Sequence, residues 1–162
     1  CDHENVRPDI LILGKALSGG VVPVSAVLAD DYIMMNIKPG EHGSTFGGNP
    51  IAAKVSMAAL QVIKDENLME KAEYLGNIFR EEMRKIDSPM IELVRGKGLL
   101  NAVIIKPKDG KEAWDVCMKM KENGVLAKPT HQHIIRFAPP LVITEEELRA
   151  AIEIIKETIL SF

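Results

Sequence analysis

Aromatic residues are scarce in this sequence, and neither sign of charge dominates it. Phe, Trp and Tyr make up 4% of the 162 residues, and 20 basic side chains stand against 23 acidic ones, for a net charge of −3. A nucleic-acid-binding protein needs a basic surface and usually aromatic residues that stack on bases. The composition therefore predicts no nucleic-acid partner.

Long apolar runs are lacking as well. No apolar run approaches the roughly 18 residues of a membrane-spanning helix, and residues 1–4 (CDHE) have neither the basic nor the apolar region of a signal peptide. The two cysteines, Cys1 and Cys117, match no zinc or redox spacing. We expect a soluble intracellular protein, in the cytoplasm or the mitochondrial matrix, with no membrane partner and no metal.

The patterns that are present are those of an α/β protein. Residues 10–13 (ILIL) form a continuous apolar run, which predicts a strand buried on both faces of a sheet. A second strand is expected within residues 24–29, after only ten intervening residues, too few for a parallel crossover with its helix. The two strands should therefore be antiparallel if they are neighbours.

A loop rich in glycine and proline follows, and then a long helical segment. Residues 38–49 contain too many glycines for a helix or a central strand. Asn49 is expected to cap the next helix and Pro50 to occupy its first position. Apolar residues then recur at helical spacing toward Lys85, which predicts a long, slightly broken helical arm.

The pattern changes at residues 87–89, the expected boundary of a C-terminal α/β domain. Strands are expected at 91–94 and 100–105 and near Val125 and Ile134, with helices near 112–122 and at the C-terminal end. The last helix should open with a capping box formed by Thr144 and Glu147. The sequence thus predicts three parts, listed by their bounds: 1–50, 51–86 and 87–162.

Lys15 is the strongest candidate for chemistry. It follows the apolar strand directly and precedes a Gly-Gly loop, a position where a pocket is expected rather than a solvated helix face. Burial disfavours the ammonium form of lysine, and a neutral amine can attack an aldehyde to form a Schiff base. The alternative is a lysine at a strand end whose amine reaches water.

Ser44 and Thr45 are candidates for binding a phosphate. They lie among glycines just before a helix N-terminus, where hydroxyl and backbone N–H groups can donate to an anion. A loop that merely needs glycine dihedrals explains the same pattern. The Gly14-Lys15 pair does not make a nucleotide-binding P-loop, because Ala16 stands where that motif needs Ser or Thr.

Arg136 stands out as a fixed charge within the apolar stretch 134–138. A planar guanidinium in such a place suggests recognition of a carboxylate, although an arginine pointing outward from an edge strand is more common. His131 and His133 alternate at strand spacing but have no evident third ligand for a metal. We interpret them, and His42, as polar loop residues.

Four segments together resemble the class III aminotransferases. The resemblance covers essentially the whole chain. Within the family, residues 128–131 and 136–140 favour the members that act on ornithine over those that act on acetylornithine or 4-aminobutyrate. The segments that carry it are residues 7–20 (RPDILILGKALSGG), 39–50 (PGEHGSTFGGNP), 95–100 (RGKGLL) and 127–140 (AKPTHQHIIRFAPP).

The resemblance implies a fold-type I, pyridoxal-phosphate-dependent homodimer, of which this chain is the C-terminal portion: the end of the mixed sheet of the large domain plus a small α/β domain. It implies that Lys15 holds the cofactor covalently and shuttles a proton, and that Ser44 and Thr45 bind the cofactor phosphate across the dimer interface. Arg136 matches the arginine that binds the α-carboxylate of 2-oxoglutarate or glutamate.

The implied reaction transfers the terminal amino group of ornithine to 2-oxoglutarate, giving glutamate 5-semialdehyde and glutamate. In the family, the aspartate that faces the pyridinium nitrogen and the main phosphate loop precede the lysine strand, and here nothing precedes Cys1. The chain alone is therefore expected to be inactive. Two alternatives stay open: another ω-amino substrate within the family, and a non-catalytic dimerisation or binding module.

Overall fold

A computed structural model describes the backbone of residues 1–162 and every side chain except that of Asp2. The chain divides into two compact units, Cys1–Glu66 and Asn67–Phe162, and each is described by itself below. Within the described residues, no helix combines the length and the apolar character that crossing a membrane requires.

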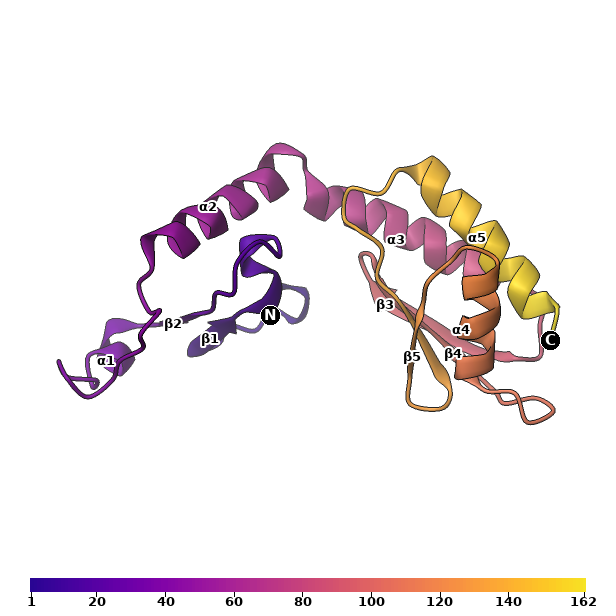
Figure 1. Cartoon of the computed structure of the whole chain (residues 1–162), viewed down its shortest axis with the longest axis horizontal. Helices are drawn as coiled ribbons and strands as arrows, with labels where there is room; N and C mark the ends of the chain where they lie inside the picture. The colour runs from indigo at the N-terminus through magenta and orange to yellow at the C-terminus, as the bar shows by residue number, and fades with distance from the viewer. The chain divides into compact units, whose positions relative to one another are not determined.

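The first unit contains a two-stranded sheet and one long helix (Figure 1). β1 and β2 pair antiparallel, with Ile10 opposite Ala29 and Leu13 opposite Ala26, so the expected strand pairing is confirmed. The elements in chain order are η1 (Asp2–Glu4), β1 (Ile10–Leu13), η2 (Lys15–Ser18), β2 (Ala26–Ala29), α1 (Asp31–Met34) and α2 (Pro50–Asp65).

The expectation that β1 is buried on both faces is wrong for this chain. Ile10 is 51% exposed and Ile12 is 74% exposed, and no residue of the strand is fully buried. The reason is that β1 pairs with β2 alone in a two-stranded sheet, which leaves most of its apolar surface uncovered.

The start of α2 follows the sequence prediction. The side-chain oxygen of Asn49 accepts hydrogen bonds from the backbone N–H groups of Ile51 and Ala52, at 2.9 and 3.3 Å. Pro50 occupies the first turn, where its missing N–H costs nothing. The predicted helical arm consists of two helices, because Glu66 and Asn67 separate α2 from α3 and Asn67 has a left-handed φ of 51°.

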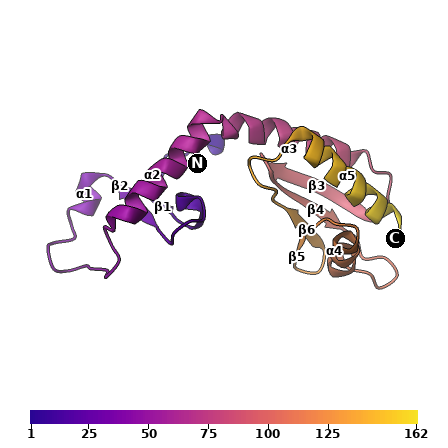
Figure 2. The ribbon, with the colours of Figure 1, turned by 45° about the horizontal axis from the view of Figure 1, so that its top comes forward.

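The second unit is a four-stranded antiparallel sheet in the order β3-β4-β6-β5, covered by helices (Figure 2). Buried side chains of β4 and β6, such as Val103, Ile135 and Phe137, point to the helices, and the alternate residues of each strand point to the other, open face. Its elements are α3 (Leu68–Arg84), β3 (Ile91–Lys97), β4 (Leu100–Ile105), α4 (Ala113–Glu122), β5 (Lys128–Thr130), β6 (Ile134–Phe137) and α5 (Glu145–Leu160).

The core of this unit lies between the sheet and the three helices. The apolar side chains of this core are almost completely buried, and every helix of the unit contributes some of them. Phe79 of α3 and Phe137 of β6 pack with ring centroids 5.1 Å apart. The capping box at the start of α5 is confirmed, since Glu147 N–H donates to Thr144 Oγ1 and Thr144 N–H donates to Glu147 Oε2.

A close backbone approach joins α3 to the turn between β3 and β4. A Cβ atom at Gly76 would overlap the carbonyl group of Gly98, so only glycine allows this packing. The buried guanidinium of Arg80 donates to Gly98 O at 2.9 Å and to Asn101 Oδ1 at 2.8 Å. These contacts fix the beginning of β4, the strand that lies beside β6.

One sequence prediction needs adjustment here, and another stays untested. The strand expected near Val125 begins at Lys128, because Gly124 adopts a φ of 96° and Val125 packs against the core at the end of α4. The division into parts 1–50, 51–86 and 87–162 stays a prediction. The second packing unit begins at Asn67 and includes α3.

Candidate functional site

Lys15 follows the carboxyl end of β1, separated from it only by Gly14. Its backbone is left-handed, with a φ of 51°, which is uncommon for a residue with a side chain. The loop that follows is held by buried Ser18, whose hydroxyl accepts a hydrogen bond from Val22 N–H at 3.1 Å. The local structure therefore fixes the strained backbone from which the Lys15 amine projects.

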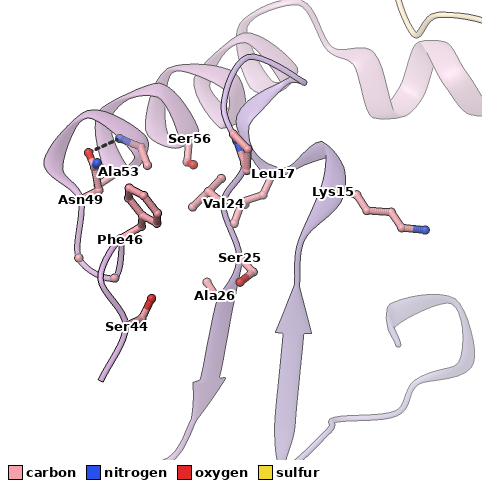
Figure 3. Close-up of a pocket in the computed structure, with 14 residues that line it drawn as sticks. Lys15, Leu17, Val24, Ser25, Ala26, Ser44, Phe46, Asn49, Ala53 and Ser56 are labelled. Carbon is pink, nitrogen blue, oxygen red and sulfur yellow. Dashed lines mark hydrogen bonds between the residues drawn. The ribbon is translucent and has the colours of Figure 1, made fainter. Parts of the chain in front are cut away.

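The side chain of Lys15 is exposed, so the expected desolvation of its amine is wrong for this chain. Figure 3 shows the amine extending away from α2 and from Ser44. Among the described side chains, no carboxylate forms an ion pair with it. The exposure has the same cause as that of β1, because the strand has only one neighbour in this chain to cover its end.

A hollow of about 690 Å³ lies between α2 and the segment that leads into β2 (Figure 3). Lys15 borders it, as does Ser44, while Asn49 and Ser56 line it from the loop and α2. The Ser56 side chain is buried, and its hydroxyl has no hydrogen-bond partner. A buried hydroxyl without a partner is costly, which marks Ser56 as an unusual residue in this wall of the hollow.

Ser44 and Thr45 lie in the exposed loop before α2, as the sequence predicts. A Cβ atom added at Gly43 or Gly48 would meet nothing within 4 Å, so the loop backbone is open to a ligand. Hydroxyls, open backbone N–H groups and an amine suit a phosphate and an aldehyde, the two polar ends of pyridoxal phosphate. The lining of the hollow contains no carboxylate that would repel the phosphate.

Arg136 lies on β6 in the second unit and points to the open face of the sheet. Its neighbours in the register are Ala102 on β4 and Lys128 on β5. β6 is an inner strand, not an edge strand, but the arginine is exposed because this face has no covering helix. A hollow of about 550 Å³ on the same face is lined by Arg136, Arg95 and His131.

The structure brings some of the candidates together. Lys15 and Ser44 border one hollow of the first unit, although the lysine amine points away from it, and Thr45 lies next to Ser44. Arg136 belongs to the second unit. Within the described residues, His131 and His133 belong to no cluster of three or more His, Cys, Asp or Glu side chains that could hold a metal.

Sequence reasoning missed two residues that border these hollows. Arg95 lies on the same face of the sheet as Arg136 because of the register of β3 with β4 and of β4 with β6. The sequence does not reveal this register. In the sequence, Ser56 is one small residue among others in an amphipathic helix. Only the packed structure shows that its hydroxyl is buried without a hydrogen-bond partner.

Comparisons with known proteins agree on one family. The family model described as aminotransferase class-III matches residues 1–159. The chain is 60% identical over 161 residues to the mitochondrial ornithine aminotransferase of Rattus norvegicus, covering 99% of the chain and 37% of that protein. It is 58% identical over 160 residues to an ornithine aminotransferase of Schizosaccharomyces pombe, covering 98% of the chain and 36% of that protein. The chain therefore spans little more than a third of the length of these relatives.

Solved structures that resemble this chain are aminotransferases as well. The acetylornithine aminotransferase of Elizabethkingia anophelis matches with a TM-score of 0.94 and 62% identity, over 100% of this chain and 41% of that one. An ornithine aminotransferase of Toxoplasma gondii, reported with partial occupancy of pyridoxal phosphate at its active site, matches with a TM-score of 0.93 and 52% identity, over 99% and 38%. The predicted fold class, part of a fold-type I transferase, is confirmed, and the chain belongs to the class-III aminotransferase family.

Proposed function

We propose that this chain forms part of a pyridoxal-phosphate-dependent ornithine aminotransferase, which transfers the terminal amino group of L-ornithine to 2-oxoglutarate and yields glutamate 5-semialdehyde and glutamate. The observation that carries the proposal is Lys15, an unpaired lysine held in a left-handed conformation at the carboxyl end of β1. Strained residues of this kind cluster at functional sites. The names of the rat and fission yeast relatives support the choice of ornithine.

Lys15 has two roles in this proposal. Its Nζ would hold the cofactor at the aldehyde carbon, and the same Nζ would move the proton to and from the substrate carbon. Pyridoxal phosphate, when bound, would supply an electron sink for the negative charge that develops at the substrate carbon. Nζ is exposed in this chain, so other parts of the enzyme must exclude water from it.

Ser44 and Thr45 bind the cofactor phosphate of a second subunit. The Lys15 amine extends away from Ser44 within one chain, which supports a phosphate contact made across a homodimer interface. Their hydroxyls and the neighbouring backbone N–H groups provide the donors that a phosphate needs. The partner of the chain is therefore a second copy of the same polypeptide.

Arg136 binds a carboxylate of 2-oxoglutarate or glutamate. Its planar guanidinium can donate two parallel hydrogen bonds to a carboxylate, and its exposure on the open face of the sheet leaves it accessible. We place the enzyme inside the cell, in the cytoplasm or the mitochondrial matrix. The mitochondrial relatives of rat and Drosophila melanogaster support this setting.

Separate half-reactions test this function. The aminotransferase polypeptide that carries these residues is loaded with pyridoxal phosphate and mixed with L-ornithine, and then with 2-oxoglutarate, while the cofactor absorbance is followed. Arg136→Gln should slow the 2-oxoglutarate half-reaction and leave the ornithine half-reaction nearly unchanged. An equal loss in both half-reactions would contradict the role of Arg136.

N-acetylornithine is the second candidate substrate. The Elizabethkingia anophelis structure, at 62% identity, is that of an acetylornithine aminotransferase. Comparing kcat/KM for ornithine, N-acetylornithine and 4-aminobutyrate separates these possibilities. The proposal expects ornithine to be preferred, and a preference for N-acetylornithine would replace ornithine in it while keeping the family chemistry.

A further inference from the structure

The open face of the four-stranded sheet carries a row of cations. Arg95 on β3 lies opposite Ala102 on β4, Ala102 lies opposite Arg136 on β6, and Arg136 lies opposite Lys128 on β5. Residues that face each other across a sheet point to the same side. Three positive side chains and one methyl group therefore form a single line across all four strands.

Nothing in the described structure neutralises this row. Among the described side chains, no carboxylate lies within ion-pairing distance of Arg95, Arg136 or Lys128, although seven ion pairs form elsewhere. Like charges directly opposite each other, as in the pair of Lys128 and Arg136, destabilise a sheet. A bound anion would remove that repulsion.

Arg95 and Arg136 of this row border a hollow, while Lys128 lies beside Arg136 outside its lining. The small side chain of Ala102 leaves space between Arg95 and Arg136, and the hollow of about 550 Å³ has no acidic residue in its lining. Lys97 adds a further positive charge. Thr130 also lines the hollow, and its hydroxyl is buried without a hydrogen-bond partner.

We propose that this cationic row, Arg95, Arg136 and Lys128, is a dianion-selective surface that recruits small dicarboxylates in preference to monocarboxylates. The inference rests on the proposed role of Arg136, which binds one carboxylate directly. Arg95 and Lys128 act through their charge, as specificity-determining residues that attract both carboxylates of the ligand. The ligand class is the five-carbon dicarboxylate that the proposed reaction consumes and produces.

The size of the effect follows from Coulomb's law. Strands are about 4.8 Å apart, so Arg95 lies roughly 10 Å from Arg136 across β4. At that distance in water, removing the charge of Arg95 should weaken binding of a dianion at Arg136 about threefold at 10 mM salt. Lys128 lies only one strand from Arg136, so removing its charge should weaken binding about tenfold, and removing both charges about thirtyfold. At 300 mM salt the loss should fall below about 1.5-fold for Arg95 and to about threefold for Lys128.

The test is a titration of the whole chain followed by backbone amide NMR shifts, with glutarate, 2-oxoglutarate and butyrate as probes at 10 and 300 mM salt. The variants are Arg95→Gln, Lys128→Gln, their combination and Arg95→Lys, which keeps the charge but loses the planar group. Lys121→Gln on α4 removes the same charge from an exposed side chain of a helix that packs on the opposite face.

The proposal expects Arg95→Gln to weaken glutarate binding about threefold and Lys128→Gln about tenfold at low salt. Both should weaken butyrate binding less, and Lys121→Gln and Arg95→Lys should have almost no effect. Unchanged dicarboxylate affinity in the double variant would overturn it, as would an equal loss in Lys121→Gln or no shift on the open face of the unchanged chain. If Arg136→Gln abolishes binding while the double variant binds dicarboxylates as tightly as the unchanged chain, the proposed role of Arg136 stands and the recruitment by Arg95 and Lys128 fails.

Discussion

Replacing Gly76 with alanine should destabilise the second unit strongly, against the usual preference of helices. At an exposed helix position, alanine is favoured over glycine by about 1 kcal/mol. Here the new Cβ would overlap the carbonyl group of Gly98, which is backbone and cannot rotate away. The turn is also fixed by the buried Arg80, which donates to the same carbonyl oxygen.

The expected cost combines two effects. Overpacking a tight contact costs about 1–3 kcal/mol, and a weakened hydrogen bond from a charged donor costs about 1.5–3 kcal/mol. After the gain in helix propensity of about 1 kcal/mol is subtracted, Gly76→Ala should lower the free energy of unfolding by about 1.5–5 kcal/mol. Denaturant titration measures this loss, followed by the fluorescence of Trp114, the single tryptophan, which lies in the second unit.

Gly43→Ala serves as the matched control, because a Cβ at Gly43 meets nothing within 4 Å. It should change the free energy of unfolding by less than about 0.5 kcal/mol. A Gly76→Ala chain that is as stable as the unchanged chain, or more stable, would refute the close approach of α3 to the turn.

The remaining predictions concern a thiol, a carboxylate and a helix cap. Burial raises the pKa of the Cys117 thiol to about 11, so a maleimide at pH 7 should label exposed Cys1 within minutes and Cys117 only in denaturant; rapid labelling of both would contradict the packing of α4. The hydrogen bond from Thr144 N–H holds the pKa of the Glu147 carboxyl below its usual value, so its contribution to stability should be fully present above the usual pKa of a glutamate and be lost as the pH falls through the lowered pKa, and Glu147→Gln should flatten that part of the pH profile. Asn49→Ala should cost about 1 kcal/mol of stability in the first unit by circular dichroism, and an unchanged midpoint would exclude the cap.

Local rules explain which parts of the fold could be predicted from the sequence. Asn49 and Pro50 determine the start of α2, and Thr144 and Glu147 determine the start of α5, through contacts within three residues. The antiparallel pairing of β1 with β2 follows from the length of the connection between them. Each of these predictions depends on neighbours in the sequence and needs no knowledge of distant packing.

Predictions that depend on segments distant in the sequence were wrong or could not be made. The apolar run of β1 suggests burial, yet burial depends on which elements cover the strand, and in this chain only β2 pairs with it. The exposure of Lys15 follows from the same missing cover. Arg95 and Arg136 lie in one row across β3, β4 and β6 because of the register of these three strands. The periodicity of apolar residues in the sequence does not determine that register.

Chemical identification of the lysine that holds the cofactor tests the central claim most directly. The aminotransferase polypeptide that carries these residues is incubated with pyridoxal phosphate, reduced with borohydride, digested and mapped by mass spectrometry, with Lys15→Ala and the exposed Lys54→Ala as variants. We predict one stoichiometric pyridoxyl group, on the peptide that contains Lys15, unchanged in Lys54→Ala and lost in Lys15→Ala. Stoichiometric labelling of another lysine, with Lys15 unmodified, would contradict the account.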